Sequence, residues 1–513
     1  MAITTSPAGL PRVAGPPAPA GAEHTGRVAR APGSEFSSRA AAEAYVGKVC
    51  FKQGPPALIG AELEWLTAIG ERSPSAPRPE LTVLADALGP YAPQSISPAS
   101  PALPLPGGSR VTIEPGGQIE LSSAPFGAAA ELCERLRADA AHLRDLLSTR
   151  DIHPFALSAD AHRPPERLLQ LPRYCAMEKS FAGIGPFGAL MMCNTAAAQV
   201  SVDAGTDPAD ISARWTALYA MGPALLAAFA CSPALHGAPP GEWASQRMRA
   251  WLRLDNQRTR PPVHHWPDPI TGYARWALDV PLLCVRPAPA SNHPAAAAGN
   301  GHADSAARNA SRSNGSRPGA ASAPNGSHPG GRGASNGTNG VNGPDSAGRG
   351  AVVPSTGPAV ADWSAPPGAT FADWLCGALD EEIGRRPDRS DLDYHLTTLF
   401  PLVRASGHLE VRYLDAQPGD TWTTPVHVFD ALLSTPEVVR EATTLVTPTA
   451  DLWSEAARHG LADPEIRTTA TALLELAAAH APTPTAATEL AAAAARCARG
   501  ISPTEGHGPE AGR

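Results

Sequence analysis

Acidic and amide side chains recur at every second position in four short segments that are rich in strand-forming residues. The segments are 58–66 (LIGAELEWL), 110–125 (RVTIEPGGQIELSSAP), 195–203 (TAAAQVSVD) and 409–415 (LEVRYLD). Successive side chains of a strand point to opposite faces, so each segment would place its polar groups on one face and its apolar groups on the other. The polar positions are Glu62, Glu64, Glu114, Gln118, Glu120, Gln199, Glu410 and Arg412.

Carboxylates gathered on one sheet would need a counter-charge. A single alternating strand indicates only a half-solvated sheet. Four such strands side by side would bring glutamates together, and their carboxylates would repel one another and raise each other's pKa. Divalent cations remove that conflict; hard oxygen donors suit Mg²⁺ or Mn²⁺, and Mg²⁺ usually binds with substrate phosphates. Arginines available for phosphates or a substrate carboxylate are Arg173, Arg247, Arg258 and Arg412.

The Pro-Gly-Gly at 115–117 determines whether the acids of the second segment share a face. A three-residue turn would set Glu114 opposite Gln118 and keep Glu114 and Glu120 on one side of the hairpin. A two-residue turn would break that register. We expect the three-residue turn.

The elements that must position these residues are strands interspersed with helices. Segment 126–150 carries Leu132, Leu136, Leu143 and Leu147 at helical spacing, which predicts a helix directly after the Pro-Gly-Gly hairpin. Segment 209–233 predicts a second helix, kinked at Gly222-Pro223. Three C-terminal segments, 435–446, 463–481 and 483–499, each open with Thr or Asp followed by proline, which is typical of a helix start. The fold class predicted is α+β, with helices beside an antiparallel sheet.

Composition divides the chain of 513 residues, which contains 56 prolines and 47 glycines. Residues 1–35 are rich in Pro, Ala and Gly without periodicity, and 287–355 contain almost no large apolar side chain. Such segments cannot bury enough surface to offset the entropy of ordering them, so both are predicted to be disordered. The catalytic core would then occupy 36–286 and 356–500, followed by a tail at 501–513.

Charge and hydropathy exclude several classes of protein. The formal net charge of −8 gives no broad cationic surface for nucleic acid. The longest uncharged run, 220–235, is shorter than the roughly 20 residues that a bilayer requires, so no membrane association is predicted. The N-terminus lacks the pattern of a signal peptide, and the eight cysteines are scattered without metal-binding spacing. We expect a cytoplasmic protein with reduced, mostly buried thiols.

The motifs of the chain resemble those of glutamate–cysteine ligases of the plant and proteobacterial type. GAELEWL resembles that family's G-x-E-x-E strand, and VTIEPGGQIELSSAP is similar to its S-x-E-P-G-G-Q-x-E-L-S-G-A-P signature. Further blocks at 172–203, 232–259 and 398–418 resemble its remaining motifs in the same order, so the likeness spans about 58–420. Within the family, the chain is most similar to the actinobacterial ligases of ergothioneine biosynthesis.

The resemblance implies a glutamine-synthetase-like core, in which the concave face of a curved antiparallel sheet binds ATP and metal ions. From the matching motif, the resemblance implies that Arg412 contacts the ATP phosphates and stabilises the transferring phosphoryl group. It implies that Glu410 is the second catalytic residue. Arg258 would also contact ATP. The implied ligands of Mg²⁺, or of Mn²⁺, are Glu62, Glu64, Glu114, Glu120, Gln199 and Glu410.

The same resemblance implies an amino-acid site. Arg173 and Arg247 would bind the carboxylates of glutamate, Tyr174 and Trp251 would shape the pocket, and Gln118 would contact substrate. The implied reaction phosphorylates the γ-carboxylate of glutamate with ATP, after which the amine of cysteine displaces phosphate. No protein nucleophile is needed. The chain departs from the family in its 287–355 insertion and at Cys175, Ala176 and Arg249, which bears more on substrate preference than on chemistry.

Several alternatives remain at this stage. The same fold could join glutamate to a different amine, and Arg412 could be a plain salt-bridge partner within the sheet. Tyr174 and Trp251 could be core aromatics. A two-metal nuclease would also cluster acids, but the negative net charge argues against it. A non-enzymatic scaffold that recruits a partner through 287–355 would not need acids on all four strands.

Overall fold

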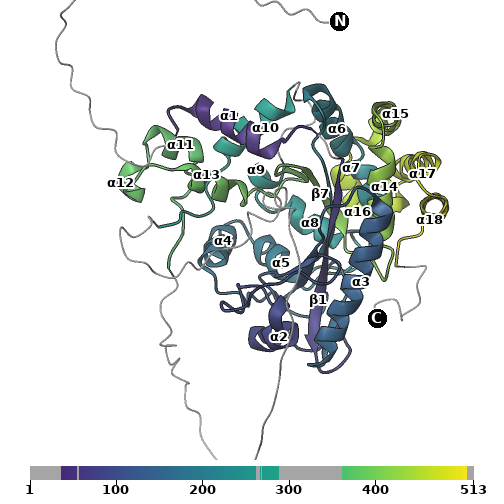
Figure 1. Ribbon diagram of the computed structural model, residues 1–513, viewed down its shortest axis with the longest axis horizontal. Coiled ribbons are helices and arrows are strands. Elements are labelled where there is room, and N and C mark those ends of the chain that lie inside the picture. Colours follow the sequence, from purple (N-terminus) through teal and green to yellow (C-terminus); the bar gives the residue numbers. More distant parts are fainter. Residues whose placement is uncertain (1–35, 55–56, 261–265, 267, 288–360, 505–513) are drawn as a thin grey trace, which may run out of the picture.

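The computed structural model describes residues 36–54, 57–260, 266, 268–287 and 361–504 (Figure 1). The predictions of disorder for 1–35 and for nearly all of 287–355 lie outside the described residues, as does most of the predicted 501–513 tail.

A seven-stranded antiparallel sheet forms the centre of the described chain. The strands run β2-β3-β1-β5-β7-β6, and β4 pairs with the far end of the long β1. The neighbours β5 and β7 come from segments more than two hundred residues apart in sequence. The predicted α+β class with an antiparallel sheet is confirmed. In chain order the strands are β1 (Ile59–Ile69), β2 (Arg110–Ile113), β3 (Ile119–Ser122), β4 (Ile152–Phe155), β5 (Ala197–Val202), β6 (Val403–Ala405) and β7 (Leu409–Asp415).

Helices cover the sheet on both sides (Figure 1). Figure 1 shows α3, α14, α17 and α18 on one side of β1 and β7, and α4 and α5 on the other. The helices are α1 (Arg39–Cys50), α2 (Leu81–Leu88), α3 (Ala129–Ser148), α4 (Pro172–Ala182), α5 (Phe187–Asn194), α6 (Pro208–Ala220), α7 (Gly222–Phe229), α8 (Gln246–Leu252), α9 (Asn256–Thr259), α10 (Pro269–Asp279), α11 (Phe371–Cys376), α12 (Asp380–Ile383), α13 (Arg389–Leu396), α14 (Thr423–Leu432), α15 (Pro436–Val446), α16 (Trp453–His459), α17 (Pro464–Ala479) and α18 (Pro484–Ala498).

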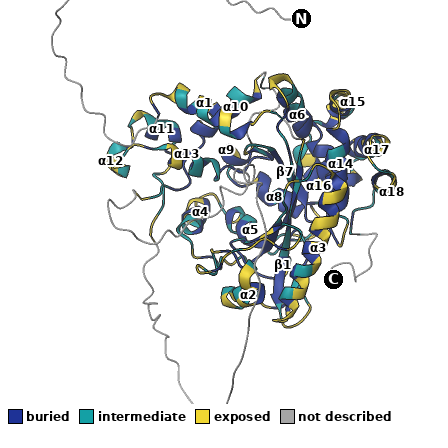
Figure 2. Cartoon of the chain, viewed as in Figure 1, coloured by how far each residue is buried: buried dark blue, intermediate teal, exposed yellow. Residues whose placement is uncertain are grey.

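The apolar sides of strands and helices meet in one core. Leu63 of β1, Val200 of β5 and Val411 of β7 pack in the same buried cluster as the four leucines predicted for α3. Figure 2 shows the exposed side of α3 turned outward and the interior strands buried. Burying an aliphatic side chain contributes about 1.5–3 kcal/mol, so this face holds the sheet in place and leaves the opposite face free for polar residues.

The predicted helix boundaries follow local chemistry closely. Thr435, Asp463 and Thr483 cap α15, α17 and α18 by accepting backbone N–H groups, and a proline follows each. The predicted kink at Gly222-Pro223 is a break at Met221 between α6 and α7. A side chain at Gly222 would lie within 1.9 Å of the Trp453 ring, so glycine permits the close approach of α16 there.

The sequence predicted reduced, mostly buried cysteines and no membrane association. All eight cysteines are free, and six of them are buried. Within the ranges that the structure describes, no helix is both long and apolar enough to cross a bilayer.

Candidate active site

Strand pairing brings the predicted acidic positions together on one face of the sheet, called here the acid face. On it, Glu64 of β1 lies directly across from Glu120 of β3. Glu62 precedes Glu64 by two residues in β1 and lies across from Ser122 on one side and Gln199 of β5 on the other. Glu410 of β7 lies across from Ser201. Directly opposed side chains in a sheet have Cβ atoms about 4.5–5.5 Å apart, so these groups are close neighbours.

The Pro-Gly-Gly turn has the predicted three-residue form. The backbone N–H of Glu114 donates to the carbonyl of Gln118 at 2.9 Å, which continues the pairing of β2 with β3 and keeps Glu114 on the side of Glu120. Gly117 has a φ of +85°, which favours glycine. A Cβ atom at Gly116 would stand 2.5 Å from the carbonyl oxygen of Cys193. Gly117 therefore supplies the left-handed backbone conformation of the turn, and Gly116 lets the turn lie against the C-terminal end of α5.

Neutral donors hold the carboxyl groups of the acid face. Thr112 donates to Glu120 at 2.6 Å, and the Ser122 hydroxyl lies between Glu120 (3.1 Å) and Glu62 (3.2 Å), within hydrogen-bond distance of both. Glu64 accepts the Gln199 amide at 3.1 Å and the backbone N–H of Ala197 at 2.8 Å. These bonds fix the directions of three carboxyl groups without supplying any positive charge.

The pKa values of these three carboxyl groups are shifted in the opposite direction from that of Glu410. Removal from water, together with neighbouring carboxylates, raises the pKa of Glu62 well above its usual value and that of Glu64 and Glu120 to about 8. Burial also acts on Glu410, but the Arg404 and Arg412 guanidinium groups outweigh it and lower its pKa to about 2. The acid face therefore lacks positive charge at β1 and β3 and has it at β6 and β7.

Two arginines and a tryptophan border the acid face at β7. Arg412 forms an ion pair with Glu410, and its guanidinium carbon lies 5.5 Å from the centre of the Trp251 ring. Arg247 lies 5.4 Å from the same ring and donates to the Arg412 carbonyl at 2.8 Å. The Nε atom of Arg412 is buried and has no hydrogen-bond partner within the described chain. Three of the residues predicted to bind substrates thus form one stack.

A β-bulge sets the direction of Arg412. The pairing of β5 with β7 shifts between Ala198 and Val200, so Arg412 and Tyr413 together lie opposite Gln199. A bulge bends the strand and redirects a side chain, and bulges are frequent beside active sites. Here it accompanies the placement of Tyr413 in the core while Glu410 and Arg412 form an ion pair on the acid face.

The remaining predicted residues lie at different distances from this centre. Tyr174 of α4 is buried, and burial followed by the charge of Glu114 raises its pKa. Arg173 donates to the Thr397 carbonyl at 2.7 Å and lies over the Tyr394 ring. No carboxylate partner is recorded for Arg173 among the described residues.

Gln118 and Arg258 form hydrogen bonds within the protein, and their predicted contacts with substrate and ATP stay predictions. The amide nitrogen of Gln118 donates to the Thr195 carbonyl at 2.9 Å, so the side chain joins the turn to the C-terminal end of α5. Arg258 is 1% exposed and donates to Asp255 and to the carbonyls of Thr398 and Pro281. Its guanidinium is buried and bonded to these groups of the protein, so contact with a phosphate would require a rearrangement.

The donors of the acid face suit a hard cation in kind. They are carboxyl and amide oxygens, and the Gln199 Oε1 atom is buried without a partner inside the described ranges. In the same ranges, no three side chains of the His, Cys, Asp and Glu types are already grouped closely enough to hold a metal ion. Glu410 is paired with arginines and Glu64 with an amide, so cation binding would have to exchange some of these contacts.

Comparison with known proteins gives the family. Residues 58–506 match the glutamate-cysteine ligase family 2. The chain belongs to that family. It is 33% identical over 452 residues to the glutamate–cysteine ligase EgtA of Mycolicibacterium smegmatis, covering 87% of this chain and 86% of that protein. It is 32% identical over 455 residues to EgtA of Mycobacterium tuberculosis, covering 88% and 85%. A chloroplastic glutamate–cysteine ligase of Medicago truncatula is 25% identical over 319 residues, covering 61% and 48%.

As a glutamate–cysteine ligase, the chain is an ATP-dependent carbon–nitrogen ligase. Two of its charged residues near the acid face were not singled out from the sequence. Arg404 of β6 donates to Glu410 at 2.6 and 3.0 Å, and Asp415 is buried at the end of β7. Arg404 stands inside the quoted 398–418 motif, but β6 has three residues, too few for alternation to reveal its face.

Proposed function

We propose that the chain joins the γ-carboxylate of L-glutamate to the amine of L-cysteine, using ATP, and that the γ-glutamylcysteine formed supplies ergothioneine biosynthesis. The observation that carries this proposal is the acid face, which borders a stack of two arginines on Trp251. The names of the two mycobacterial relatives support the identity of the substrates, and likeness to these EgtA proteins over more than four fifths of this chain supports the pathway.

The chemistry explains why acids and arginines must be neighbours. An oxygen of the γ-carboxylate attacks the terminal phosphorus of ATP, the bond to the bridging oxygen breaks, and ADP leaves. The amine nitrogen of cysteine then attacks the acyl carbon, phosphate departs, and the amine loses a proton. In the first step two anions approach each other, so positive charge has to be fixed where they meet.

The residues of this chain supply part of that charge. Arg412 would bind phosphate oxygens and give up its bond to Glu410. Its Nε atom has no partner among the residues that the structure describes, and its guanidinium lies over Trp251. Arg247 and Arg173 would hold the carboxylates of glutamate. Glu62, Glu64, Glu114, Glu120, Gln199 and Glu410 would hold Mg²⁺ or Mn²⁺, which when bound would neutralise the triphosphate.

The decisive experiment is phosphate release by the purified chain with ATP and Mg²⁺. Glutamate alone, cysteine alone and both together are compared, and mass spectrometry identifies the product. We expect release to require both amino acids and γ-glutamylcysteine to appear. Release with glutamate and another amine, but not with cysteine, would favour the alternative ligase. For the pathway, loss of the gene should lower cellular ergothioneine, and supplied γ-glutamylcysteine should restore it.

A further inference from the structure

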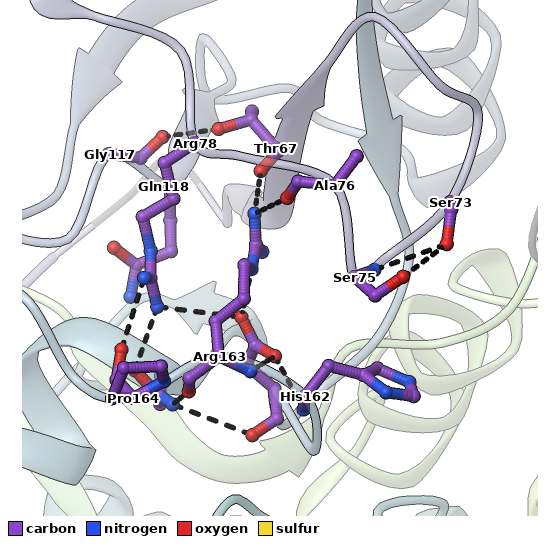
Figure 3. Close-up of polar contacts among 12 residues, drawn as sticks. Thr67, Ser73, Ser75, Ala76, Arg78, Gly117, Gln118, His162, Arg163 and Pro164 are labelled. Carbon is purple, nitrogen blue, oxygen red and sulfur yellow. Dashed lines mark hydrogen bonds and ion pairs between the residues drawn. The ribbon is translucent and has the colours of Figure 1, made fainter. Parts of the chain in front are cut away.

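A buried cluster of charged and amide side chains lies near the end of β1 (Figure 3). It consists of Arg78, Asp160, Arg163 and Asn194. The Asp160 carboxylate accepts Arg163 Nε at 2.6 Å and the backbone N–H groups of His162 and Arg163 at 2.9 and 3.0 Å. Arg78 donates to the Asn194 side chain at 3.0 Å and is 3.5 Å from Asp160. Two cations are thus buried around one anion.

The cluster is connected to the Pro-Gly-Gly turn through β1. Arg163 donates to the backbone carbonyls of Thr67 (2.7 Å) and Ala76 (3.1 Å). The hydroxyl of the same Thr67 donates to the carbonyl of Gly117 at 2.9 Å, as Figure 3 shows. Thr67 therefore links Arg163 to the turn, because its carbonyl is bonded to the Arg163 guanidinium and its hydroxyl to Gly117.

Two further contacts reach the turn from segments that begin in the cluster. The chain leaving Arg163 turns so that the backbone N–H of Leu168 donates to the Pro115 carbonyl at 2.7 Å. Asn194 directly precedes Thr195, whose carbonyl accepts the Gln118 amide at 2.9 Å. The turn is thus held from three sides, and each holding segment is anchored in the cluster.

A merely stabilising role would not need this composition. Burying an arginine costs several kcal/mol, and apolar side chains of similar volume often give equal or greater stability. What charged, directional hydrogen bonds supply instead is a fixed geometry for the segments they join. The segment joined here carries Glu114 and leads into Glu120.

We propose that Arg163, acting with Asp160 and through Thr67, is a positioning residue that fixes the 115–117 turn and so sets the place of Glu114 relative to Glu64 and Glu120 for divalent-cation binding. This inference rests on the proposed function, since it assigns the cluster to the same acid face. Arg163 itself touches no reacting atom.

The test measures binding of Mn²⁺ to the full chain by electron paramagnetic resonance, alongside steady-state kinetics and thermal unfolding. Thr67→Val removes the bond to Gly117 with almost no change of shape, and Arg163→Gln removes the bonds to Asp160, Thr67 and Ala76. We expect Mn²⁺ binding to weaken about tenfold in both variants, the range found when the supports of metal ligands are removed. The KM for Mg²⁺ should rise with it, while the KM for cysteine stays within about twofold, and Arg163→Lys should restore part of the affinity.

The matched control is Arg496→Gln on α18, which removes an arginine that also donates to two backbone carbonyls, Ile501 (2.8 Å) and Ala228 (3.0 Å). It should lower the unfolding temperature without changing Mn²⁺ affinity. Folded Thr67→Val with unchanged Mn²⁺ affinity would overturn the proposal, whether or not Arg163→Gln folds, and so would an absence of Mn²⁺ binding by the unsubstituted chain. Failure of that chain to form γ-glutamylcysteine would instead defeat the proposed function and leave the binding result to decide the positioning role.

Discussion

Glu120 is the residue on which the metal role of the acid face can be tested most simply. Its carboxyl group is buried, opposite Glu64, and held by two hydroxyl groups that Gln could also accept. Glu120→Gln keeps the shape and removes the charge, so we expect kcat to fall more than about 100-fold, because a lost cation contact removes several kcal/mol. Circular dichroism and unfolding in metal-free buffer should match the unsubstituted chain. Unchanged turnover would remove Glu120 from the proposed ligands.

The raised pKa of Glu120 also predicts how stability depends on pH. Burial, with the charges of Glu114 and Glu64, lifts that pKa from 4.5 in the unfolded chain to about 8 in the folded one. The folded chain then binds more protons than the unfolded chain, so the free energy of unfolding should decrease as pH rises from about 4.5 to 8. Urea unfolding at several pH values, without divalent cations, measures this slope. It should be smaller in Glu120→Gln and after addition of Mg²⁺; identical slopes would contradict the shift.

Arg412 distinguishes a phosphate-binding arginine from a simple salt-bridge partner. Its planar guanidinium lies over Trp251 and has donors to spare, and lysine cannot reproduce a two-pronged contact with phosphate. We expect Arg412→Lys to lower kcat about 100-fold or more. Arg137→Lys is the matched control, because Arg137 also pairs with an acid and lies over a tryptophan, Trp422, but on the exposed surface. If turnover by Arg412→Lys equals that of the control, Arg412 is only an ion-pair partner.

At the level of elements, alternation in the sequence predicted the sheet because each of its main strands is apolar on one face. The same rule predicted the turn at 115–117, since another length would have moved the acids to the wrong side. It could not predict the bulge at Arg412, which depends on how β5 and β7 pair after folding. Nor could it predict α8, a helix of seven residues held by tertiary contacts rather than by propensity.

Asp415 shows what such contacts do for α8. Its carboxylate accepts the hydroxyl groups of Ser232 and Ser245 at 2.8 Å each, and Ser245 caps the first turn of α8. The end of β7 is thereby joined to the helix that carries Arg247 and Trp251. Asp415→Asn replaces one acceptor oxygen by a donor, so we expect a fall of about tenfold in kcat/KM, dominated by the KM for glutamate. The control Ser502→Ala, at the far end of the chain, should leave kinetics unchanged; an unaltered KM in Asp415→Asn would separate this network from substrate binding.

At the scale of the whole molecule, the segments before and after the 287–355 insertion pair with each other. Its two ends are neighbours: Cys284 pairs with Ser364 in an antiparallel bridge, and the Val285 N–H donates to the Trp363 carbonyl at 2.8 Å. Composition predicted a segment without a core, but proximity of its ends could not be derived from the sequence, because it results from pairing across the insertion.

Replacing residues 290–350 with a short Gly/Ser linker should therefore leave the ligase intact. The ends already meet, and each halving of a flexible loop lowers its closure cost by only about 0.6 kcal/mol, so stability should rise slightly. We expect kcat and all three substrate KM values to stay within about twofold and the unfolding temperature to be unchanged or a few degrees higher. A loss of activity beyond tenfold, in a variant whose unfolding remains cooperative, would contradict this prediction. It would show that the insertion contributes to activity, and the hypothesis that 287–355 recruits a partner would then have to be tested.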